Sequence, residues 1–124
     1  MIECESLQLP LLGDDSIAAM HCIGLARTPR EACGILLAYP HASYGRIIEL
    51  PNHKTGEGEY ELHTADITHK LTPIELERLS PIAIWHTHPS GFVGPSVDDL
   101  RNKVAGIPYL VISMAPQGPI ATWF

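Results

Sequence analysis

The stretch Trp85–Asp99, WHTHPSGFVGPSVDD, decides how the rest of this chain is interpreted. It begins within the apolar run Ile82–His86, which predicts a central strand. Because alternate side chains of a strand project from the same face, His86 and His88 can converge on one point. The loop that follows holds two prolines and two glycines, which can turn the chain back and bring Asp99 to both imidazoles. Two imidazoles and one carboxylate suit Zn²⁺ and leave a fourth position for water, as in catalytic zinc sites.

Short apolar runs, separated by eleven prolines and ten glycines, predict many short elements around this stretch. The expected strands are Ser6–Leu12, Cys33–Ala38, Tyr44–Leu50, Glu59–Leu62, Ile82–His86, Tyr109–Met114 and Ile120–Phe124. The expected helices are Ile17–Ala26, Pro73–Leu79 and a helix from Ser96 to about Val104. Together they predict an α/β fold, in which a mixed β-sheet is flanked by a helix or two on each side. We expect this single layered domain to cover residues 1–124.

Three segments carry signals for the start of a helix. Asp14-Asp15-Ser16 offers N-cap residues before Ile17–Ala26, and that run is so uniformly apolar that we expect little of the helix to be exposed. Thr72–Glu75 has the form of a capping box with proline at the first helical position. Ser96–Asp99 repeats the capping-box pattern at the end of the histidine-containing stretch.

Composition and charge narrow the possible classes of function. The 124 residues are 45% hydrophobic, which predicts one folded domain. The net charge is −6, and the sequence contains no run of basic residues. We therefore expect no binding to nucleic acid or to an anionic membrane surface. No stretch reaches the roughly 20 apolar residues of a membrane span. The N-terminal residues MIECESLQLP carry acids where a signal peptide is positive, so we expect a cytoplasmic location.

The cysteines and the remaining histidines carry no site spacing. Three cysteines at irregular intervals argue against a disulfide scaffold and against a four-cysteine zinc site, so we expect small buried residues instead. Five histidines lack a ligand-spaced partner and are expected at the surface, although His63 could line a cleft. Trp85 alternates to the face opposite His86 and is expected in the core. The three cysteines are Cys4, Cys22 and Cys33, and the five histidines are His21, His41, His53, His63 and His69.

A catalytic zinc site also needs a proton acceptor, and Glu31 is the best candidate. It lies at the mouth of the predicted buried strand Cys33–Ala38, where partial burial would raise its pKa and suit it to proton transfer. The alternative is a solvated loop residue paired with Arg30.

Two further assignments stay open at the C-terminal end of the stretch Trp85–Asp99. Ser96 could donate a hydrogen bond to an oxyanion, or it could serve only as the N-cap of the helix that starts there. Asp98 could be the metal ligand in place of Asp99, with Asp99 then serving only the capping box.

The motif as a whole closely resembles the JAMM (MPN+) metalloprotease signature. The resemblance covers Glu31-Ala-Cys-Gly, His86-Thr-His88-Pro and Ser96-Val-Asp-Asp99. Seven residues separate His88 from Ser96, and two separate Ser96 from Asp99, as in that family. The order of the predicted elements is also similar to the JAMM fold, which is related to that of cytidine deaminases.

The resemblance implies a role for each of these residues. His86, His88 and Asp99 would bind one catalytic Zn²⁺. Glu31 would act as general base toward water and then as acid toward the leaving amine, while Ser96 would help stabilise the oxyanion. The motif's spacing in the family selects Asp99 over Asp98 as the ligand.

The resemblance also implies a class of substrate. Family members hydrolyse peptide or isopeptide bonds at the C-terminal tail of ubiquitin-like β-grasp proteins. Compact prokaryotic members act on small sulfur-carrier proteins, and this chain looks like that branch. We expect the flexible tail to bind along a strand edge, with the loops Asn52–Gly58 and Gly91–Gly94 as candidate contacts.

Two other functions remain compatible with the sequence. A RadC-like or phage tail-type JAB-domain hydrolase would use the same metal on another substrate. A non-catalytic MPN scaffold would use no metal, but such proteins lack the ligands that this chain carries.

Overall fold

The computed structural model describes residues 9–10, 13–40 and 44–124. The elements in chain order are β1 (Leu9–Pro10), α1 (Asp14–Arg27), β2 (Cys33–Ala38), β3 (Tyr44–Leu50), the 3₁₀ helix η1 (Thr64–His69), α2 (Pro73–Arg78), β4 (Ser80–His88), α3 (Val97–Arg101), β5 (Tyr109–Ala115) and β6 (Gly118–Trp123). The remainder of the predicted strand Ser6–Leu12 lies outside the described residues.

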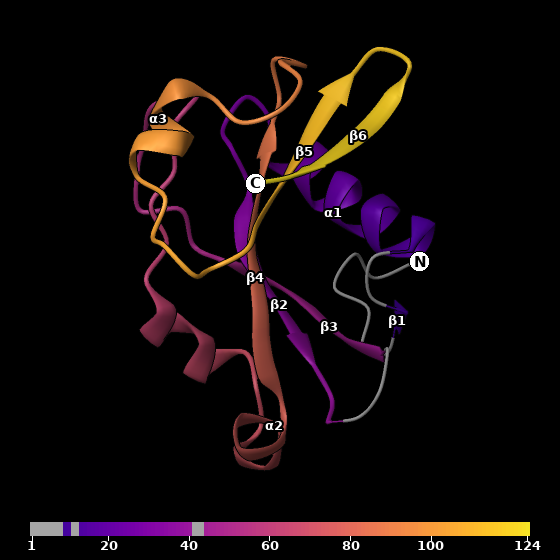
Figure 1. Ribbon diagram of the computed structural model, residues 1–124, viewed down its shortest axis with the longest axis vertical. Coiled ribbons are helices and arrows are strands. Elements are labelled where there is room, and N and C mark those ends of the chain that lie inside the picture. The colour runs from indigo at the N-terminus through magenta and orange to yellow at the C-terminus, as the bar shows by residue number, and fades with distance from the viewer. Residues whose placement is uncertain (1–8, 11–12, 41–43) are drawn as a thin grey trace.

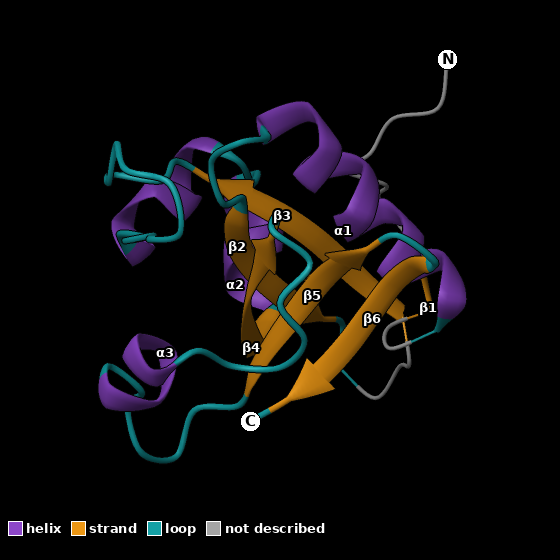
Figure 2. Cartoon of the chain, turned by 90° about the horizontal axis from the view of Figure 1, so that it is seen from above, coloured by secondary structure: helices purple, strands orange, loops and turns teal. Residues whose placement is uncertain are grey.

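The strands form one mixed sheet in the order β1-β3-β2-β4-β5-β6. Only the neighbours β4 and β5 run parallel; every other pair is antiparallel. Figure 1 shows β4 in the middle of the molecule, with α1 along one side of the sheet and η1 and α2 on the other. Seen from above, the sheet runs between α1 and α3 (Figure 2). The predicted α/β fold with a mixed, helix-flanked sheet is confirmed.

Both faces of the sheet are covered, which explains why the central strands are almost continuously apolar. Leu36 and Trp85 project toward α1 and pack with Met20 and Ile23 of that helix. The alternate residues of β2, including Ile35, lie in a second cluster on the opposite face. That second cluster comprises Ile35, Leu37, Ile48, Leu50, Leu71 and Leu79, with Tyr39, Leu62 and Ile67 at its margin.

Several predicted elements match the structure closely. The hairpin of β2 and β3 has the predicted bounds, with Cys33 opposite Leu50. The Thr72 hydroxyl accepts a hydrogen bond from the Glu75 amide, and the Glu75 carboxylate accepts one from the Thr72 amide, so the capping box of α2 is present. Trp85 is fully buried in the core, as expected.

Other predictions are wrong in ways that have physical causes. The segment 59–62 forms no strand, and the 3₁₀ helix η1 after it was not predicted. Helix α1 starts at Asp14 after the N-cap Gly13, so its two acids lie in the first turn, where they complement the helix dipole. The helix is buried on one face only, because the sheet covers one side of it, and Leu25 stays 58% exposed. Helix α3 ends at Arg101, short of Val104.

The cysteines also differ from the expectation. Cys33 is free and fully buried in β2, as predicted. Cys22 lies on the exposed side of α1 and is disulfide-bonded. The prediction of a small buried thiol is therefore wrong for Cys22. Within the described ranges, no helix is long and apolar enough to cross a membrane.

Replacing Gly34 with Ala is expected to destabilise the fold by about 1–3 kcal/mol or more. A Cβ at Gly34 would lie 1.9 Å from the Ile48 carbonyl oxygen and 2.7 Å from Trp85 Nε1, so two strands would have to move apart. Gly58→Ala is the control, since its Cβ would meet nothing within 4 Å and only its positive φ is strained. Chemical denaturation of both variants measures the difference; equal losses would contradict this packing role.

Candidate metal centre and active site

Three side-chain atoms converge at the end of β4. His86 Nε2 lies 3.2 Å from His88 Nε2, and the two nitrogens lie 3.1 and 3.0 Å from Asp99 Oδ2. Both rings project from the same face of β4 because they are two residues apart in a strand. Asp99 reaches them from the first turn of α3, after the loop has turned back. The sequence therefore predicted the convergence of these three residues correctly.

This set of atoms fits a bound cation. His88 Nδ1 lies 3.1 Å from the carbonyl oxygen of Phe92, which can only accept, so that nitrogen carries the proton of the neutral ring. His88 Nε2 then presents a lone pair to the lone pairs of Asp99 Oδ2, an arrangement that repels unless a proton or a metal ion lies between them. Ligand atoms bound at about 2.0–2.1 Å to one tetrahedral Zn²⁺ lie roughly 3.3 Å apart. The separations here are close to that value.

Asp99 is held in place by the start of its own helix. Its Oδ2 accepts a hydrogen bond of 2.8 Å from the Ser96 amide, and its own amide donates to Ser96 Oγ over 3.0 Å. The capping box predicted at Ser96–Asp99 is thus present, and it orients the carboxylate toward the histidines. Asp98, the alternative ligand, is turned outward with its side chain 76% exposed beside Arg101.

His86 is enclosed by aromatic rings. Tyr60 stacks on it with ring centroids 4.4 Å apart, and Phe124 meets it edge-on at 6.1 Å. Its Nδ1 is buried without a hydrogen-bond partner among the described residues. Burial lowers the pKa of His86, which favours the neutral imidazole that a metal ligand requires.

The pKa values of Asp99 and His88 shift in opposite directions, as expected of a carboxylate and an imidazole in close contact. Burial alone would raise the pKa of Asp99, but hydrogen bonds from His86 and His88 outweigh it and hold that pKa well below its usual range. Burial likewise lowers the pKa of His88, and the hydrogen bonds to Asp99 and to the Phe92 carbonyl outweigh it, so that the net shift is upward. Asp99 is therefore an ionised carboxylate at neutral pH.

Glu31 lies against this centre as a buried acid. It is 5% exposed, and ligand atoms of Glu31, His86 and His88 all lie within 4.8 Å of one another. Burial is the main cause that raises the pKa of Glu31 to about 7. A contact with β4 fixes the position of Glu31, because the amide of the next residue, Ala32, donates a hydrogen bond of 2.9 Å to Thr87 Oγ1.

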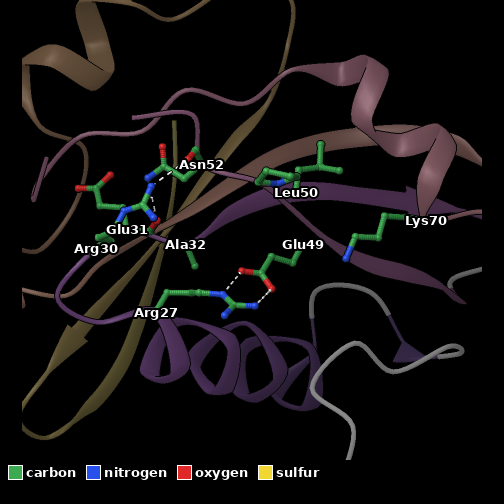
Figure 3. Close-up of a pocket in the computed structure, with 9 residues that line it drawn as sticks. Arg27, Arg30, Glu31, Ala32, Glu49, Leu50, Asn52 and Lys70 are labelled. Carbon is green, nitrogen blue, oxygen red and sulfur yellow. Dashed lines mark hydrogen bonds and ion pairs between the residues drawn. The ribbon is translucent and has the colours of Figure 1, made fainter. Parts of the chain in front are cut away.

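The alternative role for Glu31, as the partner of Arg30, does not occur. The Arg30 guanidinium donates to the backbone carbonyls of Asn52 and Lys54 instead. Figure 3 shows the pocket behind Glu31, a cavity of about 310 Å³, where Arg27 pairs with Glu49 and the Glu31 carboxylate points away from that pair.

A larger cleft opens on the other side of the centre and has a volume of about 600 Å³. One wall is the segment from Lys54 to Thr64, and the opposite wall comes from α3 and the residues that follow it. Asp99 and Tyr60 both line it, so the cleft leads directly to the candidate metal centre. Lys54 and Gly58 of the loop Asn52–Gly58 line this cleft, and so does Glu61; the residues of Gly91–Gly94 are not among those that line it.

Two residues that position the site were missed from the sequence. Tyr60 sits in the segment expected to be a strand, and nothing in its spacing pointed to His86. Asn52 braces the loop: its side-chain amide donates to the carbonyls of Glu31 and Glu59, and its oxygen accepts from the Lys54 and Glu61 amides. An asparagine just after a strand was the only available signal, and it is common in ordinary turns.

The chain matches, over residues 14–124, the model of a family described as prokaryotic homologs of the JAB domain. It therefore belongs to that family. A probable TtuB-protein conjugate cleaving protease from Thermus thermophilus is 31% identical over 88 residues, which are 70% of this chain and 58% of that protein. The chain thus matches somewhat more than half the length of this curated relative.

Solved structures agree with the fold. The solution structure of a Desulfitobacterium hafniense protein superposes with a TM-score of 0.69 at 24% identity, covering 90% of this chain and 80% of that one. A Salinibacter ruber protein superposes with a TM-score of 0.56 at 22% identity, covering 90% and 78%. The expected JAMM/MPN fold is confirmed by the family match together with these structures.

Proposed function

We propose that this protein is a zinc-dependent (iso)peptidase that cleaves at the C-terminal tail of a small ubiquitin-like or sulfur-carrier protein. The observation that carries the proposal is the convergence of His86 Nε2, His88 Nε2 and Asp99 Oδ2, with the buried Glu31 beside them. The Thermus thermophilus relative is named a probable TtuB-protein conjugate cleaving protease, which supports this class of substrate. Cleavage of such a conjugate by the metal-loaded protein is the direct test.

His86, His88 and Asp99 would hold the Zn²⁺. When bound, Zn²⁺ polarises a carbonyl and makes water a strong nucleophile near neutral pH. The three residues contribute two neutral donors and one negative charge, so one positive charge remains at the site. The Phe92 carbonyl and the Ser96 amide orient these ligands from outside.

Glu31 would move the proton. Its carboxylate accepts a proton from the attacking water and later delivers it to the nitrogen of the leaving group. A base works best when its pKa lies near the working pH, and burial places the pKa of Glu31 at about 7.

Ser96 would act twice, as N-cap and as donor to the oxyanion. Its Oγ accepts from the Asp99 amide, which uses a lone pair and leaves the hydroxyl proton free to donate. Glycine is nearly as good an N-cap, so Ser96→Gly is expected to retain zinc and stability while turnover falls about 10²-fold. Ser96→Thr, which keeps the hydroxyl, should restore most of it. Unchanged turnover in Ser96→Gly would leave only the capping role.

A protein substrate also needs a surface on which to dock. Apolar side chains are exposed on α3 and on the segments before and after it: Phe92, Val93, Val97, Leu100, Val104 and Ile107. Two of them, Val104 and Ile107, line the cleft itself. A cluster of this kind is typical of a surface that binds another protein.

Leu100→Asp is expected to raise KM for a protein conjugate at least ~10-fold, because it would place a charge in an apolar interface. KM for a short peptide copied from the tail should stay within about twofold, since Leu100 is not among the residues that line the cleft. Leu25→Asp is the matched control, since Leu25 is exposed to a similar degree, 58% against 55%, but lies on α1. An equal effect of both variants, or none from Leu100→Asp, would contradict the docking surface.

A further inference from the structure

A second group of metal-binding side chains lies in the loop that forms one wall of the cleft. His53, His63 and Asp66 each offer a ligand atom, and these atoms all lie within 4.8 Å of one another. His53 belongs to the start of the loop 51–63, His63 to its end, and Asp66 to the first turn of η1. None of the three belongs to the centre built on β4.

The contacts within this group hold two imidazoles and a carboxylate close together. The two rings stack with centroids 3.8 Å apart and planes inclined by 10°. His53 Nε2 lies 2.8 Å from Asp66 Oδ2, and His63 Nε2 lies 2.8 Å from Glu61 Oε2. With a proton on His63 Nε2 shared with Glu61, the Nδ1 atom of the same ring carries the lone pair that a metal ion needs. A carboxylate behind the second nitrogen is the usual support of a metal-bound histidine.

We propose that His53, His63 and Asp66 form a second metal site, which takes Zn²⁺ or a similar divalent transition ion. Two imidazoles and a carboxylate suit such ions and not Mg²⁺ or Ca²⁺, which prefer oxygen atoms only. The side chains of His53 and His63 are 35% and 52% exposed, so an ion can enter and the stacked rings can splay until both lone pairs face it. Because the ligands must close in, this site binds more weakly than the buried centre.

The bound ion would link the two ends of the loop. The His53 amide already donates a hydrogen bond of 2.8 Å to the Glu61 carbonyl. The loop itself contains neither helix nor strand. Between the two histidines lies Tyr60, which stacks on His86. Metal binding at the loop would therefore stiffen the wall of the cleft and hold Tyr60 over the catalytic ligand.

Zinc titration of the full-length, metal-free protein tests this, with bound metal measured after equilibrium dialysis. We expect wild type to take up two ions, a tight one and a weaker one, while His63→Gln and His53→Gln keep only the tight one. A variant with both His86→Gln and His88→Gln should keep only the weaker one. His21→Gln is the control, because it removes an imidazole on α1 without touching either group.

Hydrogen exchange gives a second measurement that does not depend on turnover. In the His86→Gln, His88→Gln variant, zinc should slow exchange of the amides of residues 52–66, and His63→Gln should abolish that protection. A single ion bound by wild type, two ions retained by folded His63→Gln, or an equal loss in His21→Gln would each overturn the proposal. These outcomes are separate from the hydrolase activity, which depends on the centre at β4.

Discussion

A Glu31→Gln variant is expected to bind zinc like wild type while turnover falls by about 10²–10⁴-fold. The amide has nearly the shape of the carboxylate but cannot accept the proton of the attacking water. The chain keeps its metal because Glu31 is not among the three atoms that converge within 3.2 Å. Single-turnover kinetics on a conjugate, together with metal content by mass spectrometry, measure both quantities.

Glu77→Gln is the matched control, since Glu77 is an exposed acid on α2, away from the centre. It should leave turnover and metal content unchanged. If Glu31→Gln turned over as fast as wild type, the base would lie elsewhere. If it instead lost its zinc, Glu31 would be a ligand and its proposed role in proton transfer would be wrong.

An Asp99→Asn variant is expected to lose zinc, with an affinity lower by more than ~10²-fold. Removing a group that only supports a ligand lowers metal affinity by at most about 10²-fold, and removing a ligand should cost more. Asp99 Oδ2 is the one anionic atom between the two imidazoles. The variant should still fold, because the asparagine oxygen can accept the hydrogen bond from the Ser96 amide.

Asp98→Asn is the natural comparison, because it makes the same chemical change one residue earlier. Asp98 is 76% exposed in its side chain and contacts Arg101 at 3.4 Å, so zinc affinity should stay within about twofold of wild type. The opposite pair of results, with zinc lost in Asp98→Asn and kept in Asp99→Asn, would contradict the ligand assignment.

The arrangement of the candidate centre could be predicted from the sequence because local rules fix its parts. Alternation along a strand places His86 and His88 on one face, and a capping box places the carboxylate of Asp99 at the start of a helix. Glu31 could be placed at the mouth of β2 because the strand that follows it is unmistakably buried. Each of these inferences needs only residues that are near one another in the chain.

The parts that could not be predicted depend on distant contacts. The alternating segment 59–62 has the pattern of a strand, but it pairs with none of the strands of the sheet, whose order is β1-β3-β2-β4-β5-β6. Tyr60 packs on His86 instead. Two of the histidines expected at the surface also depend on a distant contact. His53 and His63 stack across a loop, and no regular spacing in the sequence could have indicated that.

The central claim is metal-dependent cleavage at the C-terminal tail of a ubiquitin-like protein. The most direct test incubates the zinc-loaded protein with sulfur-carrier conjugates and weighs the products by mass spectrometry, with a chelator-treated sample and Glu31→Gln alongside. We predict that the zinc-loaded protein releases the group attached to the tail. Chelation should stop the reaction, added zinc should restore it, and Glu31→Gln should release almost nothing. Cleavage that persists in the metal-free protein, or a zinc-loaded protein that leaves every such conjugate intact, would contradict the proposed function.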